Sequence, residues 1–128
     1  MKENIAAFLR QQKIAVVGAS NDRSKYGNIV FRKLNQSGYK VFPVNPNALS
    51  VEGQPCYRAL PDLPEEVDGI VLVVPPAVTE VIVREAIKGG IRHIWMQPGA
   101  ESMEAVDFCT QQGIECIYQK CILMELNK

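Results

Sequence analysis

The sequence lacks the features that mark several large classes of protein. Its 128 residues contain no apolar run near the roughly 20 residues that span a bilayer, so no membrane partner is expected. The 14 Lys and Arg residues balance the 14 Asp and Glu residues, which leaves no excess positive charge for nucleic acid. Histidine occurs once and the four cysteines form no C-x-x-C pair, so the sequence indicates no metal site.

What remains is the composition of a globular domain. Hydrophobic residues make up 47% of the chain and charged residues 22%, and the length suffices for a buried core without disulfides. The first segment is too short and polar for a signal peptide and predicts an amphipathic helix with Ile5, Phe8 and Leu9 on one face. We predict one domain over residues 1–128 and a cytoplasmic location, where cysteine thiols stay reduced.

Buried strands alternate with helical patterns along the chain. The apolar runs are rich in Val and Ile, which is typical of a parallel sheet covered on both faces. They lie at 13–18, 40–45, 69–74 and 93–97, with a weaker fifth run at 114–119. Helical patterns separate them, and the clearest covers residues 26–36. This alternation predicts an α/β fold, a Rossmann-like three-layer sandwich with a five-stranded, mostly parallel sheet in the order 3-2-1-4-5.

The turn after the first strand has the pattern of a phosphate-binding loop. Gly18 permits a tight turn and a close approach of a ligand to the backbone. The N–H groups of Ala19 to Asn21 and the Ser20 hydroxyl would face a phosphate at the start of the next helix, near Gly27. Two cations of the same loop, Arg23 and Lys25, would add charge-assisted contacts. An ordinary tight turn with solvated cations is the alternative for this stretch alone.

The spacing of this loop differs from the common nucleotide motifs. A G-x-G-x-x-G fingerprint would need glycine at Ser20, and an NAD site would place an acid at the end of the second strand, where Asn45 stands. The next acid is Glu52. No G-K-[ST] follows the loop, so a Walker A motif is absent as well. A nicotinamide dinucleotide is therefore disfavoured.

Five segments in order carry a resemblance to a known family. They are "VVGAS" with Gly27 after it, "GYKVFPVNP", "LPEEVDGIVLVVPP", "IWMQPGA" and "KCILMEL". Together they resemble the single-domain CoA-binding proteins, which are similar to the amino-terminal CoA-binding domain of the succinyl-CoA synthetase α subunit. The resemblance runs from about Lys13 to Leu126 and implies a Rossmann-like fold that holds coenzyme A.

The resemblance also implies which residues would contact the ligand. Those around the pyrophosphate would be Gly18, Ala19, Ser20 and Asn21, with Gly27 starting the helix. Those bordering the adenosine would be Val44, Asn45 and Pro46. A wall beside the nucleotide or the pantetheine would comprise Val74, Pro75 and Pro76. Further along the strand ends would lie Gln97, Pro98 and Gly99.

Three positions depart from the family pattern. Gln119 stands where an Asp is common, and Pro98 stands where a leucine is usual. Asn47 follows the "VNP" run, where a basic residue is frequent. The sequence therefore does not indicate which residue would bind the 3′-phosphate of CoA.

Other conspicuous residues have simpler interpretations. His93 has no evident catalytic partner and is expected at the surface or at a strand edge, while Trp95 and Met96 are expected in the core. An acidic loop, Glu65, Glu66 and Asp68, is expected to be solvated. Cys121 is expected to be structural, with the further hypothesis that it lies near enough to the pocket to exchange with a CoA thiol.

The sequence therefore favours non-catalytic binding of coenzyme A or an acyl-CoA, because no catalytic constellation accompanies the phosphate loop. Two other functions stay open. One is an NAD(P)-dependent oxidoreductase. The other is an interaction module that senses acyl-CoA or redox state and passes it to a protein partner, for which the apolar tail "CILMEL" would offer an exposed surface. The sequence leaves open the choice between free and acylated CoA, a homo-oligomeric state and any protein partner.

Overall fold

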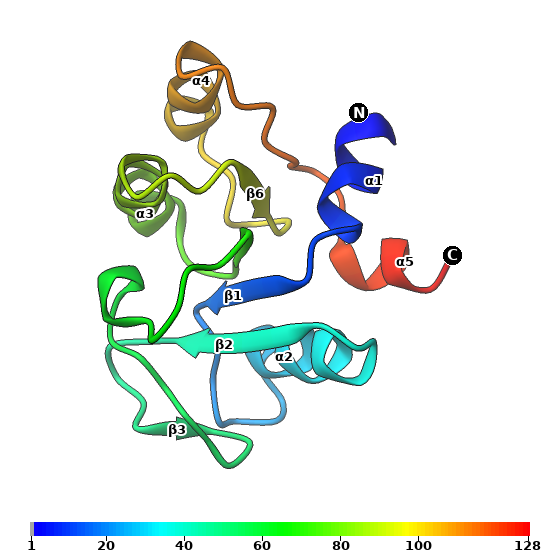
Figure 1. Cartoon of the computed structure of the whole chain (residues 1–128), viewed down its shortest axis with the longest axis vertical. Coiled ribbons are helices and arrows are strands. Elements are labelled where there is room, and N and C mark those ends of the chain that lie inside the picture. The colour runs from blue at the N-terminus through cyan, green and yellow to red at the C-terminus, as the bar shows by residue number, and fades with distance from the viewer. Residues whose placement is uncertain (1) are drawn as a thin grey trace.

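A parallel sheet forms the centre of the molecule. The computed structural model describes residues 2–128. Its main sheet has four strands, β1 (Lys13–Val17), β2 (Lys40–Val44), β5 (Gly69–Leu72) and β6 (His93–Met96). The strands lie in the order β2-β1-β5-β6, and every neighbouring pair is parallel (Figure 1). Their carboxyl ends therefore meet at one edge of the sheet, where open α/β sheets bind ligands.

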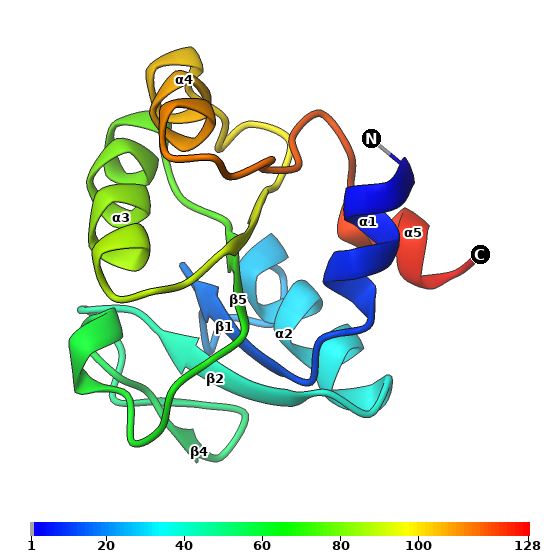
Figure 2. The same ribbon diagram turned by 45° about the horizontal axis from the view of Figure 1, so that its top comes forward.

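Helices cover both faces of this sheet. On one face pack α1 (Lys2–Leu9), α2 (Tyr26–Gln36) and α5 (Ile122–Leu126), and on the other pack α3 (Pro76–Lys88) and α4 (Met103–Gln111). Figures 1 and 2 show α3 beside α4, and α1 beside α5. Alternate residues of β1 supply the two cores: Ile14 and Val16 face α2, whereas Ala15 and Val17 face α3 and α4. The predicted Rossmann-like sandwich is confirmed.

The predicted strand order is wrong in the position of its third strand. The order 3-2-1-4-5 would place the run at 69–74 outside β2, but β5 lies between β1 and β6. All four residues of β5 are buried, and an interior position covers such an apolar strand better than an edge does. On the side of β2 away from β1, the described residues form a single parallel bridge, between Val44 and Tyr57.

The predicted fifth strand is reduced to a single bridge. Ile117 pairs with Trp95, donates its N–H to Ile94 and accepts a hydrogen bond from Met96. The ladder then stops, because the backbone turns at Gln119, whose φ of 62° lies outside the strand region. The described sheet therefore has four strands where five were predicted.

The segment between β2 and β5 contains a small hairpin that the sequence did not predict. Strands β3 (Ser50–Val51) and β4 (Gln54–Pro55) pair antiparallel, followed by a short 3-10 helix, η1 (Leu60–Asp62). Both turn residues, Glu52 and Gly53, have positive φ, 49° and 80°, as a two-residue hairpin turn requires. No helix within residues 2–128 has the length and apolar content needed to span a bilayer.

Candidate functional site

The turn after β1 is built around two glycines that no other residue could replace without movement. Gly18 has a φ of 95°, and a Cβ there would overlap the carbonyl oxygen of Val73. A Cβ on Gly27 would overlap the carbonyl oxygen of Gly18. The first turn of α2 therefore lies directly against the turn, which brings the positive end of the helix dipole to this point.

Two carbonyl groups of the turn accept hydrogen bonds from asparagine side chains, whereas three successive N–H groups have no acceptor among the described residues. Asn45 Nδ2 donates to Ala19 O at 2.8 Å, and Asn28 Nδ2 donates to Ser20 O at 2.8 Å. Within residues 2–128, no group accepts a hydrogen bond from the N–H of Ala19, Ser20 or Asn21. Successive backbone donors of this kind form an anion-binding concavity.

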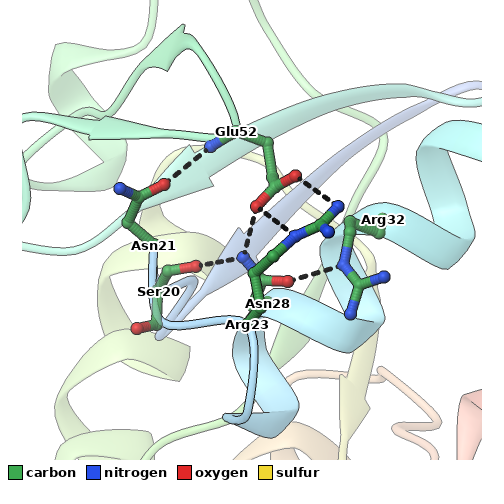
Figure 3. A network of polar contacts seen from close by, with 6 residues as sticks. All are labelled: Ser20, Asn21, Arg23, Asn28, Arg32 and Glu52. Atoms are coloured by element: carbon green, nitrogen blue, oxygen red, sulfur yellow. Dashed lines mark hydrogen bonds and ion pairs between the residues drawn. The ribbon is translucent and has the colours of Figure 1, made fainter.

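A polar network ties the β3–β4 hairpin to this turn (Figure 3). The Glu52 carboxylate accepts hydrogen bonds from Arg23 Nε at 3.2 Å and Arg23 Nη2 at 3.1 Å, and from Asn28 Nδ2 at 3.0 Å. Its backbone N–H donates to Asn21 Oδ1 at 3.0 Å, and Arg32 Nε donates to Asn28 Oδ1 at 2.7 Å. The hydrogen bonds from Asn28 and then from Arg23 lower the pKa of Glu52. This acid is therefore bound to protein groups and holds the hairpin against the turn.

On the other side of the turn lies a largely apolar cleft of about 450 Å³. It lies among the carboxyl ends of β5 and β6, the start of α2 and the start of α5. Five of its lining residues were predicted as ligand contacts: Val74, Pro75, Gln97, Pro98 and Gly99. Three others were not, Tyr26, Val73 and Ala100, and the last lining residue is Cys121, which the sequence hypothesis placed near the pocket. The cleft opens beside the Gly18 turn, because Tyr26 is the first residue of α2 and Val73 contacts Gly18.

Gln97 fixes the position of the thiol in this cleft. Its side chain is buried, with 3% of the residue exposed. Its Oε1 accepts a hydrogen bond from the N–H of Ile122 at 2.8 Å, and its Nε2 donates to Cys121 Sγ at 3.4 Å. The half-buried Cys121 thiol is thereby placed on the cleft wall, where the sequence hypothesis put it.

The structure places most of the predicted contact residues at the carboxyl edge of the sheet, but their contacts and exposure differ. Asn45 supports the turn, Val44 is buried in the core, and Pro46 is exposed after β2. Arg23 is paired with Glu52, while Lys25 is exposed at the N-cap of α2. The remaining wall residue, Pro76, starts α3 and is exposed outside the cleft lining. Their contacts with a ligand stay predictions.

Sequence reasoning missed three residues that shape the site. Glu52 and Asn28 carry the network, and Tyr26 lines the cleft with 63% of its surface exposed. The "EG" pair at 52–53 is a turn signal that points to a hairpin, but its two-residue strands show no periodicity. The signals for Asn28 and Tyr26 are weaker, a polar residue and an aromatic in the first turn of a helix.

The remaining sequence predictions concern residues away from this edge. Trp95 and Met96 are fully buried, as predicted, and His93 lies at the start of β6 with its ring edge-on to Phe8. Glu65 pairs with two lysines, Lys13 at 3.0 Å and Lys40 at 2.7 Å. Within the described part of the chain, no group of three or more His, Cys, Asp and Glu side chains is arranged to hold a metal ion.

Fold and site together define an α/β domain with a phosphate-type turn at the carboxyl edge of its sheet. Comparison with known proteins identifies its family: residues 12–127 match the model of the CoA binding domain. The chain therefore belongs to the CoA binding domain family, as the resemblance implied.

Relatives of two kinds share this domain. A conserved hypothetical protein from Pyrococcus furiosus has a solved structure with 46% identity and a TM-score of 0.84, over 89% of this chain and 98% of that one. A hypothetical protein from Pyrococcus horikoshii is 34% identical with a TM-score of 0.91, over 98% and 89% of the two chains. The α subunit of the ADP-forming acetate–CoA ligase II of P. furiosus is 30% identical over 90% of this chain. The match spans only 28% of that ligase subunit.

Proposed function

We propose that this protein binds coenzyme A or an acyl-CoA and does not itself catalyse a reaction. The observation that carries the proposal is the junction of two unlike surfaces at Gly18. One is a turn in which the N–H groups of Ala19 to Asn21 have no protein acceptor within residues 2–128, and the other is an apolar cleft with a thiol on its wall. Coenzyme A has the matching parts in the same order, a pyrophosphate followed by a pantetheine arm that ends in sulfur.

Electrostatics and packing would share the binding energy. The backbone donors and the α2 N-terminus favour the pyrophosphate, and each such charge-assisted contact is typically worth about 1.5–3 kcal/mol. The cleft of about 450 Å³ is of the size that small-molecule sites usually have. Its wall of valine, proline and tyrosine side chains suits the pantetheine arm.

The oxidoreductase alternative has less support from the geometry. An NAD site would need a carboxylate facing the ribose. The first acid after Asn45 in the sequence, Glu52, already accepts hydrogen bonds from Arg23 and Asn28, and the side-chain amide of Asn45 donates to Ala19 O. The sensing alternative keeps one supporting observation, since Cys121 reaches the cleft and begins the segment that forms α5. The cytoplasmic location and a homo-oligomeric state stay predictions.

A thermal-shift titration with CoA, acetyl-CoA and NADH tests the proposal. CoA or acetyl-CoA is expected to raise the melting temperature, with a stabilisation of about 2.7 kcal/mol at a ligand concentration of a hundred times Kd. NADH at the same concentration is expected to have a much smaller effect. Equal stabilisation by NADH, or none by CoA at millimolar concentration, would contradict it.

A further inference from the structure

The strand order fixes the direction in which CoA would lie across the site. The turn after β1 stands between two flanks, because β2 is on one side of β1 and β5 is on the other. The apolar cleft belongs to the β5 and β6 flank. If the pantetheine arm occupies that cleft and the pyrophosphate the turn, the adenosine and its 3′-phosphate must extend over the β2 flank. This step rests on the proposed function.

On the β2 flank, the turn itself carries Arg23, a cation that hydrogen bonds to Glu52 hold in place. Two of its N–H groups are directed at Glu52, and a guanidinium has five donors, so three remain for another acceptor. Its side chain is 67% exposed, whereas Glu52 beneath it is 22% exposed. Glu52 is itself held by Asn28 and, through its backbone, by Asn21 (Figure 3). Glu52 thus holds the guanidinium through two of its N–H groups, and the arginine side chain stays largely exposed beside the turn.

Asn47, which follows β2, supplies no charge to this flank. Its N–H donates to Asn45 Oδ1 at 2.8 Å, and its side chain is exposed. Lys25 is also exposed, but it stands at the N-cap of α2 with no side-chain hydrogen bond that orients it. A planar guanidinium that is already oriented loses less conformational entropy on binding a phosphate than a mobile lysine does.

We propose that Arg23 binds the 3′-phosphate of the CoA ribose and that Glu52 acts as its positioning residue. The pair would then make the site selective for CoA over 3′-dephospho-CoA, which lacks only that phosphate. Glu52 keeps its own hydrogen bonds while Arg23 donates to the phosphate. The carboxylate is already neutralised by Arg23, with Arg32 bound to the adjacent Asn28, so its repulsion of the phosphate is reduced.

Calorimetric titration with CoA and 3′-dephospho-CoA measures the selectivity as a ratio of the two Kd values. The wild-type protein is expected to prefer CoA by about tenfold, which corresponds to about 1.4 kcal/mol. Arg23→Gln is expected to reduce the ratio to about one, through weaker CoA binding alone. Glu52→Ala is expected to reduce it by a smaller factor, and Glu52→Gln, which keeps an acceptor for Arg23, to recover part of it. Arg10→Gln removes an exposed arginine at the end of α1 and is the matched control.

Because each ratio compares two ligands on one variant, a loss of stability does not mimic the effect. The inference fails if wild-type protein binds both ligands equally, or if Arg23→Gln keeps the preference for CoA. In either case the proposed function stands, because CoA still binds. If neither ligand binds the wild-type protein, the proposed function and this inference fail together. An unchanged ratio in both Glu52 variants would overturn the positioning role of Glu52.

Discussion

The two flanks of the Gly18 turn differ in almost every physical respect. On the β2 flank, Glu52, Arg23 and Asn28 form a charged, hydrogen-bonded network at the surface. On the β5 flank, the cleft is walled by apolar side chains, with the buried Gln97 and the Cys121 thiol as its polar features. A ligand that bridges both must be charged at one end and apolar at the other.

The two flanks are also held in place by different kinds of contact. The β2 flank is fixed by directional hydrogen bonds that converge on one carboxylate, so removal of one partner affects the others. The β5 flank is shaped by backbone segments that follow β5 and β6, with Gln97 as the clamp between β6 and α5. Substitutions in the shared turn should affect both flanks, whereas substitutions in one flank should affect that flank alone.

Replacement of Gly18 by Ala is expected to have the largest effect. The new Cβ would overlap Val73 O, so the loss of stability should be about 3 kcal/mol, together with loss of CoA binding. Gly38→Ala is the matched control, because Gly38 has nearly the same φ, 96°, and a Cβ there would meet no heavy atom within 4 Å. It should cost about 1 kcal/mol and leave binding intact. If urea unfolding gave the same loss of free energy of unfolding for both variants, the packing of the turn against Val73 would be unimportant for stability.

Replacement of Tyr26 by Ala tests the apolar flank alone. Tyr26 lines the cleft, so CoA affinity should fall about tenfold as the aromatic contact with the pantetheine arm is lost. Adenosine 3′,5′-bisphosphate, which has no pantetheine arm, should bind as it does to the wild-type protein. Val81→Ala removes an exposed apolar side chain of α3 outside the cleft and serves as the control. Equal weakening of both ligands would place Tyr26 at the phosphates.

Cys121 should be the cysteine that reacts with CoA disulfide. Its thiolate would attack one sulfur of the disulfide, forming a mixed disulfide and releasing one CoA thiol. Cys109 and Cys116 are buried, and burial raises the pKa of the half-buried Cys56, so these three should react more slowly. Peptide mass spectrometry locates the adduct, with Cys121→Ser as the control. An adduct found mainly on another cysteine would show that Cys121 is not the residue that lies near the thiol of bound CoA.

The smallest expected effect concerns the pH dependence of the polar flank. Because Asn28 and Arg23 lower the pKa of Glu52 below its ordinary value of 4.5, its ionised form stabilises the folded state above about that pH. This contribution is lost as the pH falls through the lower folded-state pKa. The melting temperature of wild-type protein should therefore exceed that of Glu52→Gln near neutral pH, and the difference should shrink below about pH 4.5. A difference independent of pH would exclude the carboxylate charge as its source.

The parts of the site that could be predicted from sequence are those that depend on neighbours in the chain. The turn from Gly18 to Gly27 and its helix follow from local backbone chemistry and were predicted with correct bounds. Glu52 could not be found this way, because it reaches Arg23 only through a hairpin whose strands are two residues long. The position of β5 depends on whether an interior or an edge position covers an apolar strand better, which is a property of the whole fold.

The central claim is that CoA lies across both flanks, with its phosphates on the turn and its thiol arm in the cleft. Backbone amide NMR during titration of the wild-type protein tests this most directly. CoA should shift the signals of Ala19 to Asn21 and of Gly99 and Ala100, whereas adenosine 3′,5′-bisphosphate should shift only the turn and the hairpin. Shifts confined to the opposite edge of the sheet, around Gly69 and His93, or the same shifts with both ligands, would contradict the account.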